Sequence, residues 1–167
     1  MNDGPLQGSR DPRLYRPNVG IALFSKRGHV FLGRRINAHG PFQWQMPQGG
    51  IDRGEDPEQA ALREMEEEIG VSKKLVSILE ETEDWLYYDF PSDLKARLPG
   101  PYIGQRQKWF ALRFEGSDSD VRLDIATPEF DAWRWADLSE VSPLIIHFKR
   151  PVYDQVVKRF ARWTESE

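Results

Sequence analysis

The stretch Gly49–Val71, GGIDRGEDPEQAALREMEEEIGV, carries the strongest local signals in this sequence of 167 residues. It predicts a turn followed by a helix over residues 57–69. An acidic N-cap with a glutamine three residues later makes a capping box, proline suits the first helical turn, and glycine suits the left-handed residue after the last turn. The residues in these positions are Asp56, Gln59, Pro57 and Gly70.

Three carboxylates share one face of this helix. At about 100° per residue, Glu68 lies about 40° from Glu64 on one side and Glu67 about 60° on the other, whereas Glu66 points away. A solvated acidic face is the plain interpretation. However, like charges four residues apart repel each other, and the helix dipole disfavours anions near a C-terminus. A hard cation such as Mg²⁺ would relieve both costs, so we expect a metal site on this face.

The remaining pattern predicts a single domain of mixed architecture. We expect strands over residues 19–24, 29–35, 43–46, 76–82, 85–90, 102–114 and 130–135, a helical turn over 137–140, and an amphipathic helix from Pro151 onward. Strands interspersed with two helices predict an α/β or α+β fold with a mixed sheet. Residues 1–15 lack periodicity and are interpreted as a flexible N-terminal arm, which leaves 16–167 as the domain.

Composition limits the classes of function. The chain has no cysteine, which excludes disulfides and thiolate metal sites and favours a reducing, cytoplasmic location. It has neither a run of about 18 apolar residues nor a secretory h-region, so no membrane association is expected. With a net charge of −4, binding of DNA or RNA by bulk charge is not expected, and RNA would need a local basic site.

The stretch from Gly49 to Val71 resembles the Nudix box, G-x5-E-x7-R-E-U-x-E-E-x-G-U, at every specified position. This resemblance implies a Nudix α/β/α sandwich and hydrolysis of a nucleoside diphosphate linked to another group. It implies Mg²⁺ as cofactor, with Mn²⁺ as a possible substitute. It also implies that Glu55 and Arg63 hold the shape of the loop and helix. The metal ligands implied are the Gly49 carbonyl and the side chains of Glu64, Glu67 and Glu68; the spacing leaves open which glutamate takes a proton, and Glu64 is one candidate.

Segments outside the box are similar to bacterial RNA 5′-pyrophosphohydrolases and to the dinucleoside-polyphosphate (Ap4A-type) hydrolases of the same subgroup. That resemblance implies conversion of a 5′-triphosphate or diphosphate RNA end to a monophosphate, which initiates mRNA decay, or asymmetric cleavage of Ap4A. The segments are YRPNVG (Tyr15–Gly20), WQMPQGG (Trp44–Gly50), IGQRQKWF (Ile103–Phe110), PEFDAWRW (Pro128–Trp135) and FKR (Phe148–Arg150).

The subgroup resemblance assigns roles residue by residue. Glu129 becomes a further metal ligand or catalytic carboxylate, although a turn acid beside Pro128 is its plain interpretation. Phe148 becomes a stacking surface for a base, although core packing is the alternative. The base-binding cleft implied is Arg16, Phe148, Lys149 and the backbone of Ile146; Arg35, Tyr88, Gln105 and Lys108 are implied to meet phosphates, with structural roles as the alternative.

Three functional hypotheses follow. The first is an RNA pyrophosphohydrolase, and the second is a dedicated Ap4A hydrolase with the same site. The third, from another class, is a catalytically silent module that binds nucleotides or RNA. An intact repulsive cluster of glutamates argues against a silent module, and a calcium-type structural site lacks the EF-hand ligand pattern. The sequence names no protein partner. It departs from the bacterial relatives at His147, in the slightly longer loop Ala38–Phe42, and over Ser92–Pro101.

Overall fold

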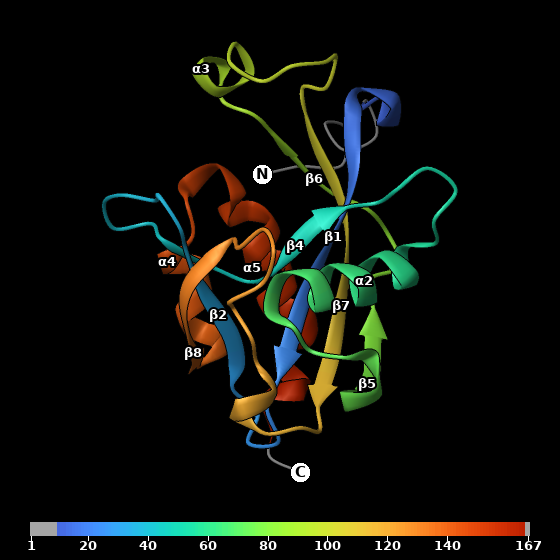
Figure 1. The fold of residues 1–167 in the computed structure, drawn as a ribbon. Coiled ribbons are helices and arrows are strands. Elements are labelled where there is room, and N and C mark those ends of the chain that lie inside the picture. The colour runs from blue at the N-terminus through green and yellow to red at the C-terminus, as the bar shows by residue number, and fades with distance from the viewer. Residues whose placement is uncertain (1–9, 166–167) are drawn as a thin grey trace.

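The computed structural model describes residues 10–165, and a mixed β-sheet forms its centre (Figure 1). Strand β1 (Tyr15–Phe24) runs parallel to β7 (Gly104–Phe114) along its full length. The other pairings are antiparallel: β2 with β1, β3 and β8, β4 with β1, and both β5 and β6 with β7. These strands are β2 (Val30–Arg35), β3 (Trp44–Gln45), β4 (Gln48–Gly50), β5 (Val76–Glu81), β6 (Leu86–Asp89) and β8 (Phe130–Ala136).

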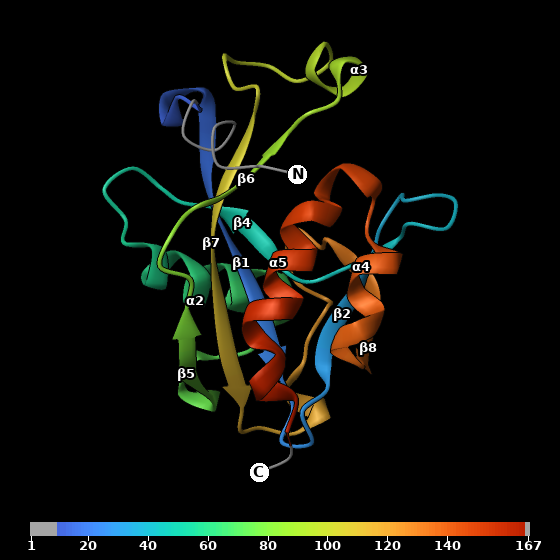
Figure 2. The same ribbon diagram turned by 180° about the vertical axis from the view of Figure 1, so that it is seen from behind.

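Helices cover both faces of the sheet. Helix α2 (Pro57–Ile69) lies on one face (Figure 1), and α5 (Arg150–Phe160) and α4 (Val141–Leu144) lie on the other (Figure 2). Each face buries its own apolar core, one beneath α2 and one beneath α5. The predicted α/β/α sandwich with a mixed sheet is therefore confirmed. The short elements are α3 (Ser92–Lys95) and the 3₁₀ turns Pro12–Leu14, Lys73–Leu75, Asp118–Asp120, Leu138–Glu140, His147–Lys149 and Ala161–Thr164.

Helix α2 begins and ends where its capping residues predict. The Asp56 carboxylate accepts a hydrogen bond of 3.1 Å from the Glu58 backbone, and the Gln59 side chain accepts one of 3.3 Å from the Asp56 backbone. Gly70 adopts φ 71°, a left-handed conformation that glycine reaches without strain. A good N-cap is worth about 1 kcal/mol, so these local contacts hold the helix in register on the sheet.

The strands differ from the expected ranges where tertiary pairing decides. Strand β1 begins at Tyr15 rather than at residue 19, because Tyr15 already pairs with Gly104 of β7. Strand β4 was not expected, because its glycines read as a turn; it forms by pairing antiparallel with β1. Helix α3 lies within Ser92–Pro101, a range for which the sequence pattern predicts neither strand nor helix.

The described residues just before position 16 contact the sheet. Residues 12–14 form a 3₁₀ turn, and Tyr15 is buried with its hydroxyl donating to Asp89 at 2.5 Å. Tyr15 is thus the first residue of β1, and the division into an arm over 1–15 and a domain over 16–167 stays a prediction. Residues 1–9 of the expected arm lie outside the described residues. No helix in the described part of the chain combines the length and apolarity that crossing a bilayer requires.

Candidate functional site

Arg63 on α2 joins the loop after β4 to the carboxylates of the helix. Its guanidinium donates two hydrogen bonds of 2.8 Å to Glu55 and one of 2.9 Å to the Gly50 carbonyl. It also donates to Glu64 at 3.0 Å and to Glu67 at 3.1 Å. This pairing holds the pKa of Glu55 at about 2. The predicted roles of Glu55 and Arg63 in shaping the loop and helix fit these contacts.

The two innermost carboxylates face strand β4. Glu64 lies directly over Gly49: a Cβ atom at position 49 would come within 2.0 Å of its carboxyl carbon. Glu68 is 7% exposed, and burial, followed by repulsion from Glu64 and Glu129, raises its pKa to about 9. Burial also raises the pKa of Glu64, although Arg63 opposes this shift. Glu68 therefore lies where too little positive charge is present to stabilise its ionised form.

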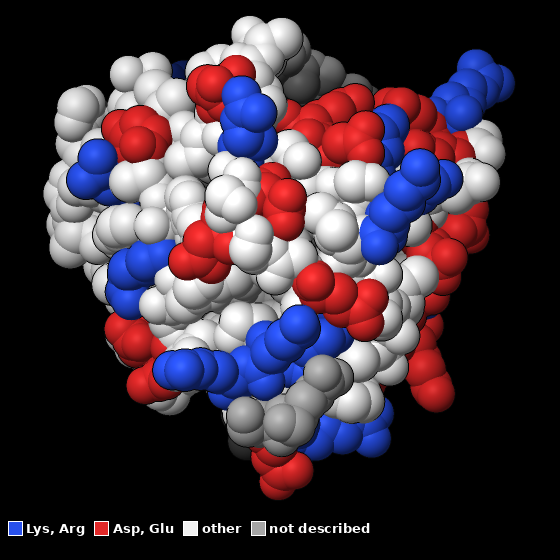
Figure 3. Space-filling view, turned by 60° about the horizontal axis from the view of Figure 1, so that its bottom comes forward, with Lys and Arg blue, Asp and Glu red and all other residues white. Residues whose placement is uncertain are grey.

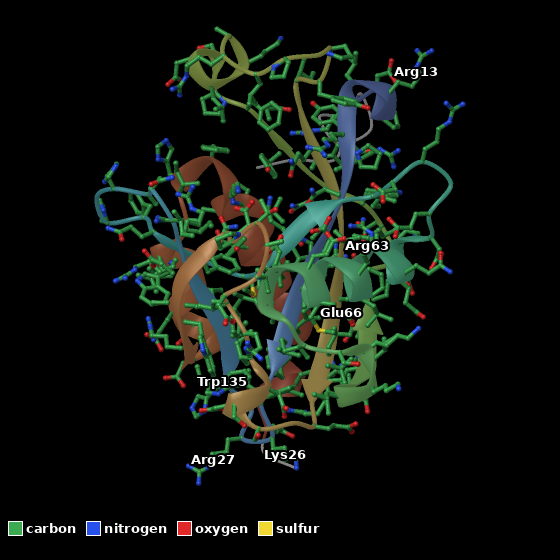
Figure 4. All side chains as sticks on the ribbon, in the orientation of Figure 1. Arg13, Lys26, Arg27, Arg63, Glu66 and Trp135 are labelled. Atoms are coloured by element: carbon green, nitrogen blue, oxygen red, sulfur yellow. The ribbon has the colours of Figure 1, made fainter. Side chains whose placement is uncertain are left out.

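These carboxylates border an acidic groove of about 380 Å³. The loop at residues 125–129 forms its other side and brings Glu129 close enough to raise the pKa of Glu68. Glu66, which helical geometry turns away from the other three, is exposed but also borders the groove. Figure 4 shows Arg63 and Glu66 on different sides of α2, with Arg63 on the side nearer β4.

The donor set of the acidic groove suits a divalent cation in chemistry and charge. Its oxygens are hard carboxylate ligands, and Arg63 contacts Glu64 and Glu67 but donates no hydrogen bond to Glu68 in the described structure. Among residues 10–165, no three acidic or histidine side chains converge as a complete metal cage. That arrangement is compatible with Mg²⁺, which usually takes one or two protein carboxylates and completes its shell with water and phosphate.

A larger cavity of about 560 Å³ adjoins the groove across strand β4. Gln48 of this strand lines the cavity, and its backbone lowers the pKa of Glu68 on the other side. Seven residues of the implied cleft and phosphate sites line it. They are Arg16, Arg35, Tyr88, Gln105, Ile146, Phe148 and Lys149.

The cations of this cavity are poorly neutralised. Arg16 has no hydrogen-bond or ion-pair partner within residues 10–165, and its Nη2 lies 2.7 Å from where a Cβ atom of residue 50 would stand. Arg35 donates to the Phe42 carbonyl at 3.0 Å. Lys149 approaches Gln48 Oε1 at 3.4 Å, and burial with the nearby Arg35 lowers its pKa to about 8. An anion entering the cavity would meet Arg16, Arg35 and Lys149, and within residues 10–165 none of these three forms a hydrogen bond or ion pair with a carboxylate.

Aromatic side chains form the floor of the same cavity. The ring centroids of Phe148 and Tyr88 are 5.8 Å apart, and Phe148 packs against the core beneath α5 while also lining the cavity. Both interpretations of Phe148, packing and a stacking surface, therefore fit its position. The Tyr88 hydroxyl donates to Gln105 Oε1 at 2.7 Å, which fixes these two polar side chains beside Phe148.

Lys108 lies elsewhere. Its Nζ atom donates to the backbone carbonyls of Thr82 and Glu83 at 3.1 and 2.5 Å, and it does not line the large cavity. The ammonium thus lies against the segment that joins β5 to β6, which supports a structural role for Lys108 rather than a phosphate contact. Gln107, in the same polar run of β7, is buried, bonds Asn18 and Trp109, and does not line the large cavity. The alternation of a strand sends Lys108 to the face opposite Gln105.

Sequence reasoning missed Gln48. Gln48 contacts both the large cavity and the acidic groove, because its side chain accepts from Lys149 and its backbone hydrogen-bonds Glu68. Its position next to Gly49 in the motif was a signal, but its role depends on β4 pairing with β1. On the face shown in Figure 3, acidic side chains gather at the upper right and basic side chains form a band across the lower part.

Comparisons with known proteins agree with this arrangement. The family model described as NUDIX domain matches residues 14–160. The chain is 58% identical over 158 residues to an RNA pyrophosphohydrolase of Rhodospirillum rubrum, covering 94% of this chain and 92% of that protein. It is 50% identical over 157 residues to an RNA pyrophosphohydrolase of Acidiphilium cryptum, covering 92% and 94%.

Solved structures share the fold at low sequence identity. The E. coli dihydroneopterin triphosphate pyrophosphohydrolase superposes with a TM-score of 0.66 at 20% identity, covering 87% of this chain and 99% of that one. A C. elegans Ap4A hydrolase superposes with a TM-score of 0.62 at 22% identity, covering 88% and 98%. Nudix hydrolases generally use divalent metal ions, which agrees with the acidic groove. With a family model that spans most of its length, and with its box glutamates gathered beside β4, this chain belongs to the NUDIX domain family.

Proposed function

We propose that this chain is an RNA 5′-pyrophosphohydrolase. It would convert 5′-triphosphate or diphosphate RNA ends to 5′-monophosphates in the cytoplasm, the step that initiates mRNA decay. The observation that carries the proposal is the junction at Gln48, where an acidic groove meets a cavity that holds both cations and an aromatic floor. The relatives from R. rubrum and A. cryptum, both RNA pyrophosphohydrolases, support the RNA end as substrate.

The acidic groove would hold Mg²⁺, with Mn²⁺ as a substitute. Bound metal supplies neutralisation of the charge that develops on the phosphates and lowers the pKa of a bound water. Arg63 keeps Glu64 and Glu67 oriented through hydrogen bonds of 3.0 and 3.1 Å. A carboxylate of the groove would accept the proton of the attacking water, and Glu64 remains one candidate. The ligands proposed are the Gly49 carbonyl and the carboxylates of Glu64, Glu67, Glu68 and Glu129.

The large cavity would orient the RNA end. Arg35 and Lys149 would meet the phosphates next to Gln48, since among the described residues their hydrogen bonds go to the Phe42 carbonyl and the Gln48 amide rather than to a carboxylate. Tyr88 and Gln105 can add neutral hydrogen bonds. Arg16, Phe148 and the Ile146 backbone would hold a base on the outer side of the cavity, because stacking on an aromatic face suits an unpaired RNA end.

A dinucleoside polyphosphate such as Ap4A is the second candidate substrate. It offers the same phosphates and a base that Phe148 could stack on, and an Ap4A hydrolase shares the fold. A silent binding module is disfavoured. Burying Glu68 beside Glu64 and Glu129 costs folding free energy that a module without metal chemistry would not need.

The test is a comparison of kcat/KM for 5′-triphosphate RNA, 5′-diphosphate RNA and Ap4A with Mg²⁺ and with Mn²⁺. We expect both RNAs to be the better substrates and to yield monophosphate ends. A higher kcat/KM for Ap4A would favour the second candidate, and no hydrolysis of any of them would favour a silent module. With Phe148→Ala, RNA hydrolysis should slow more than hydrolysis of a nucleoside triphosphate.

A further inference from the structure

The large cavity extends beyond the residues assigned to the base cleft. Its outer wall is the segment from Phe90 to Tyr102, which carries α3 (Figure 1). Two side chains of this wall, Leu98 and Tyr102, are 40% and 36% exposed. Large apolar side chains this exposed are few among residues 10–165, yet these two face one cavity. The wall has no role in the site described so far.

The wall is held at both ends. The backbone of Phe90 donates to the Ile103 carbonyl at 2.8 Å, and Ile103 donates to the Leu14 carbonyl at 2.8 Å. Between these anchors, α3 adds its own backbone hydrogen bonds, such as Lys95 to the Pro91 carbonyl at 2.9 Å. A loop with close, bonded ends is a compact surface element that is often functional. Its side chains are therefore positioned before any ligand arrives.

The wall also carries an available positive charge. Arg97 donates through Nε to the Asp93 carbonyl at 3.4 Å, and its Nη atoms have no other partner in the described part of the chain. Arg97 and Arg16 line the same cavity. A phosphodiester between two bases could thus meet a guanidinium on the outer wall.

We propose that Leu98, Tyr102 and Arg97 bind the nucleotide that follows, on the 3′ side, the base held against Phe148. This inference rests on the proposed function. Tyr102 and Leu98 would contact the face of the next base, and Arg97 would contact the phosphate between the two bases. An aromatic platform beside an arginine is the combination that binds single-stranded RNA without reading its sequence. The enzyme would thereby favour an RNA chain over an isolated nucleoside phosphate.

The experiment measures kcat/KM for 5′-triphosphorylated substrates of one, two, three and four nucleotides. Wild-type protein should gain activity as the chain grows past the base held by Phe148, and then reach a plateau. Tyr102→Ala should lower kcat/KM at least about fivefold on the longer RNAs, the lower bound for one lost stacking contact. It should leave the mononucleotide unchanged. Arg97→Gln should act in the same way, and Tyr102→Phe should retain the gain.

Ile78→Ala is the matched control, because Ile78 is 43% exposed on β5 and does not line the cavity. Equal kcat/KM for all chain lengths in the wild type would overturn the inference, as would an equal loss on the mononucleotide in Tyr102→Ala. In either case RNA hydrolysis itself would continue and the proposed function would stand. Failure of the wild type to hydrolyse any of the RNAs would instead refute the proposed function.

Discussion

Arg63 donates hydrogen bonds of 2.8 Å from Nε and from Nη2 to the two carboxylate oxygens of Glu55. The planar fork of arginine matches a carboxylate in this way, and the compact ammonium of lysine does not. The same guanidinium bonds the Gly50 carbonyl, Glu64 and Glu67. A single side chain therefore sets the relative position of the glycine strand and the acidic helix face.

Arg63→Lys should keep the charge and lose the fork. We expect kcat to fall about 10- to 100-fold, as is typical when a group that orients metal ligands is changed. The melting temperature should change little by comparison, because the core beneath α2 is untouched. Arg53→Lys, an exposed residue of the same loop, is the control. Full activity of Arg63→Lys would show that the fork is dispensable.

Glu68→Gln should abolish metal-dependent turnover and stabilise the metal-free protein. The pKa of Glu68 is raised from 4.5 to about 9 in the folded state, so folding favours the protonated acid. Its contribution to stability is present below pH 4.5 and is lost as pH rises toward about 9. Glutamine cannot ionise and should add about 1–3 kcal/mol to the free energy of unfolding near pH 8.

Denaturant unfolding with a chelator at pH 5 and pH 8 measures this effect. The gain in Glu68→Gln should be larger at pH 8, and added Mg²⁺ should raise the melting temperature of the wild type more than that of the variant. Glu66→Gln, an exposed neighbour, should show neither change. A variant that keeps its activity would refute the assignment of Glu68 as a metal ligand.

Gly49→Ala should inactivate the enzyme more than Gly50→Ala. A Cβ atom at 49 would lie 2.0 Å from the Glu64 carboxyl carbon, and one at 50 would lie 2.7 Å from the end of the Arg16 side chain. Displacing Glu64 by about 1 Å can cost about 100-fold in kcat. Arg16 can swing aside, so Gly50→Ala should mainly raise KM. Steady-state kinetics of the two variants test this prediction, and a similar kcat for both variants would contradict it.

The activity should decline at alkaline pH because of Lys149. Burial and Arg35 lower the pKa of this lysine to about 8, so it loses its proton, and its attraction for phosphate, as pH rises through that value. The profile of kcat/KM, which reports the free enzyme, should fall above about pH 8. In Lys149→Arg the side chain stays charged and the fall should move to higher pH. An unmoved profile would assign the decline to another group.

Short-range sequence signals were enough to predict the helix of the Nudix box and its acidic face. The caps at Asp56 and Gly70 and the turn-by-turn placement of Glu64, Glu67 and Glu68 depend on contacts within a few residues, which local chemistry predicts. The family resemblance likewise indicated the sandwich fold and the residues around Phe148, because whole segments of the chain carry it.

The contacts between side chains that are distant in the sequence could not be predicted in this way. Lys108 and Gln105 belong to one polar run of β7, but side chains alternate between the two faces along the strand. The strands that pair with β7 place the Lys108 ammonium at the carbonyls of Thr82 and Glu83. Gln48 joins the two halves of the site because β4 pairs with β1, and nothing local predicts that pairing. The outer wall around Tyr102 faces Phe148 because the strands on either side of it fix its ends. These placements depend on sheet register and burial, and both are set by contacts between residues that are far apart in the chain.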